Sequence, residues 1–400
     1  MSNDLRERID NVRIKALALG VLGVLVTLPA LLFTRELFFG AWLVAFIFVF
    51  MFAAGGLATV LLRHLAGGAW SVILQRISEA AARTLWMFVP VFALIFYFAH
   101  DVLYPWTVAG YVAGHTVVQA KESYLNMPFF WLRFAGFFMI WLGLTGFYSH
   151  FSKKLDETED ARYAIWMQRL SAPALILFFV TMTLAATDWG MSLEPTWYST
   201  IYGPLWIVSQ GLSLLALAII VLTSVDHEPP VAGNVHAKIY INIGNMFLAF
   251  VVLWSYFSFS QFLIVWSGNL PEEISWYLRR SEGGLVTISF LLALFHFLVP
   301  MLLLLYRRTK GGVIPLRRLA CAVIVMRFID IYWNIVPSFE GYANRIGWGM
   351  TFFAMAAAIG LGGIWLWYFL HLLAQRPLVP EHDPRARILL AKEKEAASHA

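Results

Sequence analysis

Ten apolar stretches, each close to the length of one membrane crossing, constrain this chain of 400 residues more than any other feature. About 20 helical residues cross the roughly 30 Å of hydrocarbon in a bilayer. Hydrophobic residues make up 60% of the chain and charged residues 13%, which is more apolar sequence than a soluble core can bury. The sequence therefore predicts an all-α polytopic membrane protein with ten transmembrane helices, at 14–33, 39–62, 84–104, 127–149, 171–191, 199–223, 238–264, 282–306, 317–337 and 349–373.

The Lys and Arg residues indicate how the chain is oriented. Most of them lie in the two terminal segments and in alternate loops, so they fall on one side of the predicted crossings. Short loops rich in Lys and Arg stay on the cytoplasmic side of a membrane. We therefore expect both termini to be cytoplasmic, as an even number of crossings requires. This distribution also accounts for the net charge of +5, without a basic face that would bind nucleic acid.

Two kinds of segment predict local structure around the crossings. The inner loop 152–169 begins with charged residues and continues through Ile165 and Trp166, which is typical of a short interfacial helix. The small-residue run 354–363 and the pair Gly55 and Gly56 predict that helices approach one another closely.

Arg327 and Asp330 are the most unusual residues within the predicted crossings. A charged side chain at the bilayer centre costs about 2.5–3.5 kcal/mol on insertion scales. The two residues are one helical turn apart, so they face the same side and can pair, and Asn334 continues that face. Two interpretations remain open: an ion pair that holds helices together, or a site that takes up and releases protons.

Other polar residues mark the interior of the membrane. His296 lies near the middle of its crossing, and Asn245 and Gln261 lie on the crossing 238–264. Because these side chains are costly against lipid, they should face other helices or internal water. They favour either hydrogen-bonded contacts between helices or a path for protons. Asp188 and Glu194 lie toward the outside, where a carboxylate can exchange protons.

The sequence offers few ligands for a redox centre. The single cysteine, Cys321, excludes a disulfide framework, and no CxxC or CxxCH motif is present to hold zinc, covalent haem or an iron-sulfur cluster. His100, His150 and His371 lie near the ends of crossings at differing depths. We therefore expect no metal site, no haem b between two histidines, and redox centres only on partner subunits.

Two stretches of the chain are similar to a known family. "TDWGMSLEPTWYSTIYG" (187–203) and "YFSFSQFLIVWSGNLPEEISWYLRR" (256–280) resemble signature stretches of the ActF type of membrane subunit in bacterial alternative complex III, a quinol:electron-acceptor oxidoreductase. This type is itself NrfD/PsrC-like. The resemblance includes the loop "YLNMPFFWLR" (124–133) and extends over nearly the whole chain. The family pattern has a histidine where this chain has Thr196, so the resemblance does not extend a protonatable role to that position.

The resemblance implies a domain organisation. Crossings two to five and six to nine would form two four-helix bundles, flanked by crossings one and ten, in the bacterial cytoplasmic (inner) membrane. The corresponding units are a cytoplasmic N-terminus with the first helix (1–38), the first bundle (39–191), the second bundle (192–337), the tenth helix (338–373) and a cytoplasmic tail (374–400).

The resemblance also implies partners and a function. The partners would be a second NrfD-like membrane subunit, an iron-sulfur subunit, c-type cytochrome subunits, small membrane subunits and lipids, with haem c and iron-sulfur clusters on the partners and quinol or menaquinol as substrate. The chain itself would be a non-catalytic scaffold that conducts protons along a polar route. The residues of this route are Asn245, Gln261, His296, Arg327 and Asp330.

Two alternatives remain open. In one, the chain itself binds quinone, and Asp188, Glu194 or Asp330 accepts the protons of the quinol. In the other, the chain is a stand-alone secondary transporter with Arg327 and Asp330 as ligands. Transporters often have glycine or proline breaks in paired mid-span positions, whereas Pro90 and Pro173 are isolated.

The outer segment 267–284 collects charges directly after an apolar crossing. Arg and Trp suit anchoring to another protein, so this segment predicts a docking surface for extrinsic subunits. An ordinary amphipathic segment held at the headgroups by its tryptophans is the alternative. The residues expected to contact partners are Trp266, Glu272, Glu273, Trp276, Arg279 and Arg280.

Overall fold

A computed structural model describes residues 3–228, 231–235, 237–339, 347–380, 383, 388–389 and 391, and within these ranges it contains helices and no strand. The first half comprises α1 (Asn3–Thr27), η1 (Leu28–Leu32), α2 (Arg35–Ala66), α3 (Ala69–Ala82), η2 (Leu85–Met87), α4 (Phe88–Leu103), η3 (Pro105–Thr107), α5 (Ala109–Gly114), α6 (Thr116–Gln119), α7 (Met127–Thr158), α8 (Ala161–Trp189) and η4 (Met191–Leu193). The second half comprises α9 (Tyr202–Ser224), α10 (Val231–Asn234), α11 (Ala237–Gly268), α12 (Pro271–Arg280), α13 (Leu285–Leu291), η5 (Leu292–Leu298), α14 (Val299–Leu305), α15 (Arg307–Gly311), α16 (Val313–Ile335), η6 (Val336–Ser338) and α17 (Trp348–Leu373).

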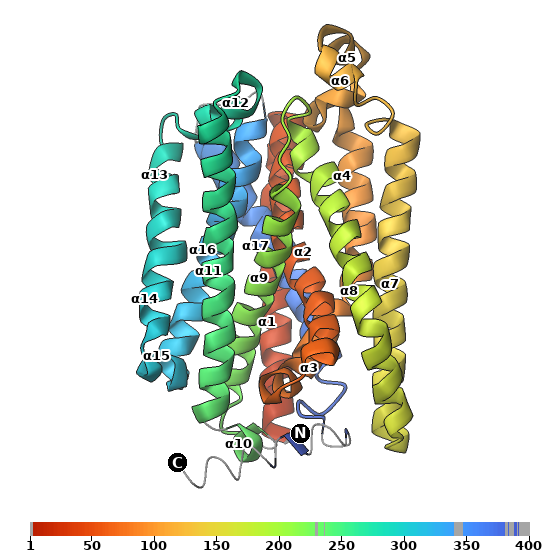
Figure 1. Cartoon of the computed structure of the whole chain (residues 1–400), viewed down its shortest axis with the longest axis vertical. Coiled ribbons are helices and arrows are strands. Elements are labelled where there is room, and N and C mark those ends of the chain that lie inside the picture. The colour runs from red at the N-terminus through yellow and green to blue at the C-terminus, as the bar shows by residue number, and fades with distance from the viewer. Residues whose placement is uncertain are drawn as a thin grey trace.

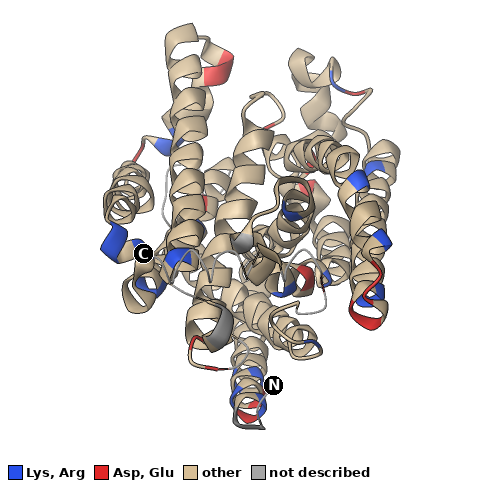
Figure 2. Ribbon diagram, turned by 60° about the horizontal axis from the view of Figure 1, so that its bottom comes forward, with Lys and Arg blue, Asp and Glu red and all other residues tan. Residues whose placement is uncertain are grey.

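Ten helical segments in the described ranges are long and apolar enough to cross a membrane, which confirms the predicted fold class. They are Leu5–Leu32, Arg35–Ala66, Trp70–Leu103, Met127–Thr158, Ala161–Leu193, Tyr202–Ser224, Ala237–Gly268, Leu285–Leu305, Val313–Ser338 and Trp348–Leu373. The start of α1 and the end of α17 lie together, since Arg13 Nη2 is 3.2 Å from His371 Nδ1. Figure 2 brings this end forward and shows Lys and Arg at several helix ends. We call it the inner end, after the predicted cytoplasmic side, and we call the opposite end the outer end.

The long helix α2 packs against α3, α4, α8, α9 and α17 (Figure 1). One bundle consists of α2, the α3–α4 pair, α7 and α8, and a second consists of α9, α11, the α13–α14 pair and α16. The helices α1 and α17 pack against each other, and α17 packs on α2. These close contacts need glycine, because a Cβ on Gly23 would lie 2.5 Å from the Gly360 backbone nitrogen. The predicted packing role of the run 354–363 is confirmed at this interface.

The two bundles meet along α2 and α9. A Cβ on Gly55 of α2 would lie 2.2 Å from the carbonyl oxygen of Gln210 on α9. Any larger residue at Gly55 would therefore force the two helices apart, as predicted for a small residue at a helix interface.

Aromatic side chains fill the first bundle. Phe46, Phe92 and Trp189 are fully buried at its centre. The ring centroid of Phe92 lies 4.9 Å from that of Trp189 and 5.0 Å from that of Phe46. Offset and edge-on contacts between aromatic rings at such distances each contribute about 0.5–1.5 kcal/mol beyond area burial.

Two predicted segments differ from the structure at the inner end. The third crossing starts near residue 70 rather than 84, because the amphipathic helix α3 precedes η2 and α4 and is buried in the bundle. The interfacial helix predicted over 152–169 is not formed. Instead α7 continues to Thr158 and α8 begins at Ala161, with Glu159 in a left-handed conformation (φ 53°) that reverses the chain. The amphipathic pattern belongs to the projecting ends of two long helices.

Candidate functional site

The Arg327–Asp330 group lies at the centre of the second bundle. Their side chains form the predicted ion pair on α16, and the two residues are 1% and 5% exposed. Arg327 Nη1 also lies 3.4 Å from His296 Nε2 on η5, and the His296 ring packs edge-on against Trp254 of α11 at 4.2 Å. Asn334 Nδ2 donates to Asp330 Oδ1 at 3.2 Å. Side chains from three segments of the bundle thus surround one buried carboxylate.

A cavity of about 830 Å³ borders this carboxylate. It lies between α11, the α13–η5 segment and α16, and its polar lining includes Asp330, Asn334 and Gln261. Most of the remaining lining is apolar or aromatic, and it includes Phe259 and Phe290, which are exposed on the outside of the bundle. Among the described residues that line it, none is Lys or Arg. This size and this mixture of apolar walls with a few polar groups are typical of small-molecule sites.

The helix beside the cavity has an irregular turn. Leu292–Leu298 form a π-helical turn, and His296 lies within it. π-Bulges occur frequently at functional sites, because the extra residue re-aims a side chain. Here the turn directs His296 toward Arg327.

A buried hydrogen-bonded network joins Asp330 to the outer end of the molecule. The backbone oxygen of Asn334 accepts from Arg280 Nη2 at 2.6 Å, and Arg280 Nη1 donates to Glu194 Oε1 at 3.1 Å. Glu194 Oε2 lies 3.3 Å from Nη1 of the partly exposed Arg279. The network therefore runs from the middle of the second bundle to its outer surface.

Burial changes the titration of two groups at the outer end, Arg280 of this network and Tyr277 beside the cavity. Burial lowers the pKa of the Arg280 guanidinium, and the Glu194 carboxylate offsets part of that effect. The guanidinium lies 3.6 Å from the ring of Trp276, a cation–π contact that favours the charged form. Burial raises the pKa of Tyr277 to about 12, so its hydroxyl stays neutral near pH 7 and accepts from Gln261 Nε2 at 3.4 Å.

Residues 187–203 and 256–280 pack against each other at the outer end. Trp197 stacks on Trp276 with centroids 4.9 Å apart, and Trp197 Nε1 donates to the backbone oxygen of Glu273 at 3.1 Å. Trp276 and Arg280 are consequently 3% and 1% exposed. They hold α12 to the chain itself and do not face outward.

The other predicted docking residues lie on the surface. Trp266 is 64% exposed, and Glu272 is exposed as well. Glu273 and Arg279 are partly exposed. The accessible part of the predicted docking surface is therefore smaller than the sequence indicates, because one face of the amphipathic helix α12 covers the bundle.

The remaining predicted residues lie outside the Asp330 group. Asp188 forms a buried two-point ion pair with Arg133 of α7 in the first bundle, at 2.8 and 3.0 Å. Gln261 lines the outer part of the cavity and accepts from the Ser199 hydroxyl at 3.1 Å. Asn245 is exposed near the inner end and accepts from Lys310 Nζ at 2.6 Å. The predicted route thus divides, with Asn245 apart from His296, Arg327 and Asp330.

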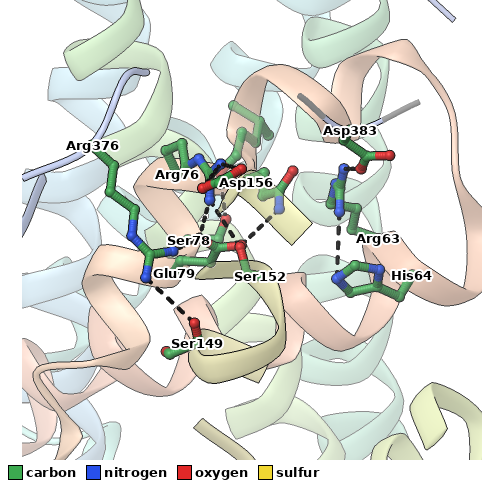
Figure 3. Close-up of polar contacts among 12 residues, drawn as sticks. Arg63, His64, Arg76, Ser78, Glu79, Ser149, Ser152, Asp156, Arg376 and Asp383 are labelled. Atoms are coloured by element: carbon green, nitrogen blue, oxygen red, sulfur yellow. Dashed lines mark hydrogen bonds and ion pairs between the residues drawn. The ribbon is translucent and has the colours of Figure 1, made fainter. Parts of the chain in front are cut away.

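Sequence reasoning missed a second buried polar cluster, at the inner end of the first bundle (Figure 3). Arg76 Nη1 donates to Glu79 Oε2 at 2.9 Å and to Ser152 Oγ at 2.8 Å, and Arg76 Nη2 binds both carboxylate oxygens of Asp156 at 2.6 Å. Arg376, which follows α17, lies 3.6 Å from Glu79. The signal that was available is the spacing of Arg76 and Glu79, which matches that of Arg327 and Asp330.

Beside this cluster, the chain beyond α17 is held by another buried ion pair. Arg63 Nη2 at the end of α2 donates to Asp383 Oδ2 at 3.0 Å, and Arg63 Nη1 lies 3.4 Å from His64 Nε2 (Figure 3). Both Arg376 and Asp383 therefore join the segment after α17 to the first bundle.

Comparison with known proteins does not extend these observations. Within the described residues, no group of three or more His, Cys, Asp or Glu residues is placed to hold a metal ion. No protein-family model matches the sequence, and no curated protein is similar to it. The chain is a polytopic membrane protein with ten candidate spans in the part that the structure describes, and its own residues are the basis for assigning it a function.

Proposed function

We propose that this chain is an integral membrane subunit of a bacterial quinol-oxidising complex, of the alternative complex III type, and that it moves protons through Asp330. The resemblance of residues 187–203 and 256–280 to that family supports the assignment to a complex. The observation that carries the proton role is the buried Arg327–Asp330 pair at the wall of the 830 Å³ cavity.

The neighbours of Asp330 suit proton exchange. A carboxylate beside a fixed cation in a low-dielectric site changes its protonation when that cation moves. Arg327 Nη1 contacts both the Asp330 carboxylate and the imidazole of His296. In the proposal, a shift of Arg327 toward His296 leaves Asp330 to take up a proton, and the return of Arg327 releases it. Water in the cavity then carries the proton toward Tyr277 and Ser281 at the outer end.

The test is Asp330→Asn in the assembled complex, reconstituted in vesicles. This change keeps the shape of the side chain but replaces the carboxyl group by an amide, which cannot take up and release a proton. We expect the number of protons moved per electron to fall while the complex still assembles. The matched control is Asp101→Asn, which removes a carboxylate from an exposed pair with Arg35. An unchanged proton-to-electron ratio in Asp330→Asn would exclude the proton role, and absence of the chain from the purified complex would exclude the assignment.

A second candidate function is quinone binding by the chain itself. The cavity favours it, because aromatic walls stack on a planar ring, while Gln261 and Asn334 offer amide donors and Asp330 an acceptor. The exposed Phe259 and Phe290 border the cavity, so a ligand can enter from the bilayer. A photoreactive quinone analogue should label peptides of α11 and α13. Labelling confined to another subunit would contradict this candidate.

A further inference from the structure

A second cavity, of about 510 Å³, lies at the inner end and belongs to neither the Asp330 group nor the outer network. Three parts of the chain form it: the end of α3, the last turns of α7 and the segment that follows α17. Its charged lining residues are Arg76, Arg83, Lys153, Asp156, Glu157 and Arg376. Four cations therefore face two carboxylates.

The cations differ in how closely carboxylates bind them. Arg76 is fully engaged by Glu79 and Asp156. Arg83 donates only to the neutral amide oxygen of Gln375, at 3.0 Å, and forms no ion pair with any residue in the described part of the chain. Arg376 Nη1 lies 3.6 Å from Glu79, a carboxylate that Arg76 binds more closely, and Arg376 Nη2 donates to the neutral backbone oxygen of Ser149 at 3.4 Å. The guanidinium groups of Arg83 and Arg376 thus leave positive charge directed at the cavity.

Close to Arg83 lies an aromatic pair formed by Trp86 and Tyr368. Trp86 follows Arg83 by one turn and is 49% exposed. Its Nε1 donates to the Tyr368 hydroxyl of α17 at 3.3 Å, and the two rings meet edge-on at 5.7 Å. Half-exposed Trp and Tyr side chains mark the level of the lipid headgroups. A molecule bound at Arg83 would therefore extend its apolar part along Trp86 and Tyr368, between α4 and α17.

We propose that this cavity binds the phosphate headgroup of an anionic phospholipid, with the phosphate held by Arg83 and Arg376 and the acyl chains lying against Trp86 and Tyr368. Arginine pairs with phosphate through two parallel N–H donors, which suits these two guanidinium groups. Basic pockets between transmembrane helices on the inner side are a recurrent headgroup site. The adjacent aromatic pair favours a lipid over free phosphate, which would leave Trp86 and Tyr368 without a role.

The position of the site gives the lipid a structural effect. The headgroup would join α3, α7 and the segment after α17, which are already linked through Glu79. A bound lipid should therefore hold the inner end of the first bundle together and raise the temperature at which the chain unfolds.

The test uses the full chain in nanodiscs of phosphatidylcholine with or without phosphatidylglycerol, followed by native mass spectrometry of the lipid retained after detergent extraction. We expect wild-type protein to retain phosphatidylglycerol selectively. The double variant Arg83→Gln/Arg376→Gln should bind it at least roughly tenfold more weakly. The matched control is Arg307→Gln/Arg308→Gln, which removes two exposed cations from the same end and should bind as wild type does.

Three outcomes would overturn the proposal. The first is equal retention by wild type and the Arg83/Arg376 variant, and the second is an equal loss in the control pair, which would indicate only a diffuse surface charge. The third is full displacement of the lipid by millimolar inorganic phosphate, which would indicate a free-anion site. Because Arg376→Gln alters a contact of Glu79, the single variant Arg83→Gln provides a second test, since the Arg83 side chain donates to the amide oxygen of Gln375 and not to Glu79. It should weaken retention by a few-fold, and an unchanged value would count against the site.

Discussion

In the first bundle, Phe46, Phe92 and Trp189 occupy the space between the helices, whereas in the second bundle part of that space is a cavity beside Asp330. A buried arginine–carboxylate pair of the first bundle, Arg133 with Asp188, can also be compared with the Arg327–Asp330 pair of the second. In the first bundle, the Arg133 guanidinium that pairs with Asp188 lies over the rings of Tyr124 and Phe129. The difference indicates that the first bundle is rigidly packed, whereas the second leaves a carboxylate accessible from a cavity.

The largest difference should appear when one phenylalanine is removed from each bundle. Phe92→Ala should cost about 3–5 kcal/mol of stability, because lipid cannot reach the cavity left among the surrounding rings. Phe290, which is 72% exposed on α13, should cost within about 0.5 kcal/mol when changed to alanine. The measurement is unfolding of the purified chain in mixed micelles. Equal losses in the two variants would show that the bundles are packed alike.

The second prediction compares the two ion pairs. Arg133→Met should cost about 3–5 kcal/mol, because it leaves the Asp188 carboxylate buried and unpaired. Arg327→Met should cost less, about 1–3 kcal/mol, since Asp330 borders a cavity that water can enter. Adding Asp188→Asn or Asp330→Asn to the respective variant should recover part of the loss. A cost for Arg327→Met as large as that for Arg133→Met would show that the cavity stays dry.

The third prediction adds volume to each bundle. Ala185 is fully buried on α8, so Ala185→Phe should destabilise by about 1–3 kcal/mol through overpacking. Ser289 lines the cavity, so Ser289→Phe should be accommodated with little loss and should also reduce labelling by a quinone analogue. Unfolding midpoints of the two variants provide the measurement. A destabilised Ser289→Phe would indicate that the cavity closes in the membrane.

These pairs also show how far sequence reasoning reaches. The pairing of Arg327, Asp330 and Asn334 follows from helical spacing, so it is predictable within one segment. The pair formed by Arg133 and Asp188 joins residues 55 positions apart on two helices, and no spacing rule connects them. Arg133 and Asp188 can each be recognised from sequence as a charged residue in an apolar segment. That they pair with each other depends on how α7 and α8 pack.

Hydropathy alone also misplaces the inner cluster. Arg76 and Glu79 fall between two predicted crossings, because charges lower the mean hydropathy of a window even when they neutralise each other. In the structure they are buried on α3. Likewise, the pattern of 266–280 predicts that its charges and tryptophans all lie at the surface, whereas the amphipathic helix α12 turns Trp276 and Arg280 inward. In neither case does the pattern alone give the direction of the polar face, because that direction depends on how the helix packs on the bundle.

The smallest expected effect on the chain itself concerns the outer surface of the second bundle, where the exposed residues differ from their buried neighbours. Trp266→Ala should change stability by no more than about 0.5 kcal/mol, because the side chain is 64% exposed and has little packing to lose. If extrinsic subunits dock there, the same variant should nevertheless lower their co-purification with the chain, since exposed tryptophans are frequent anchors of interfaces. Trp276→Ala is the matched contrast, because it should weaken the chain first and partner binding only as a consequence. If Trp266→Ala does not alter co-purification, this surface does not dock extrinsic subunits, and Trp266 contacts the lipid headgroups instead. The two bundles would then differ in the cavity of the second bundle and not in a docking surface.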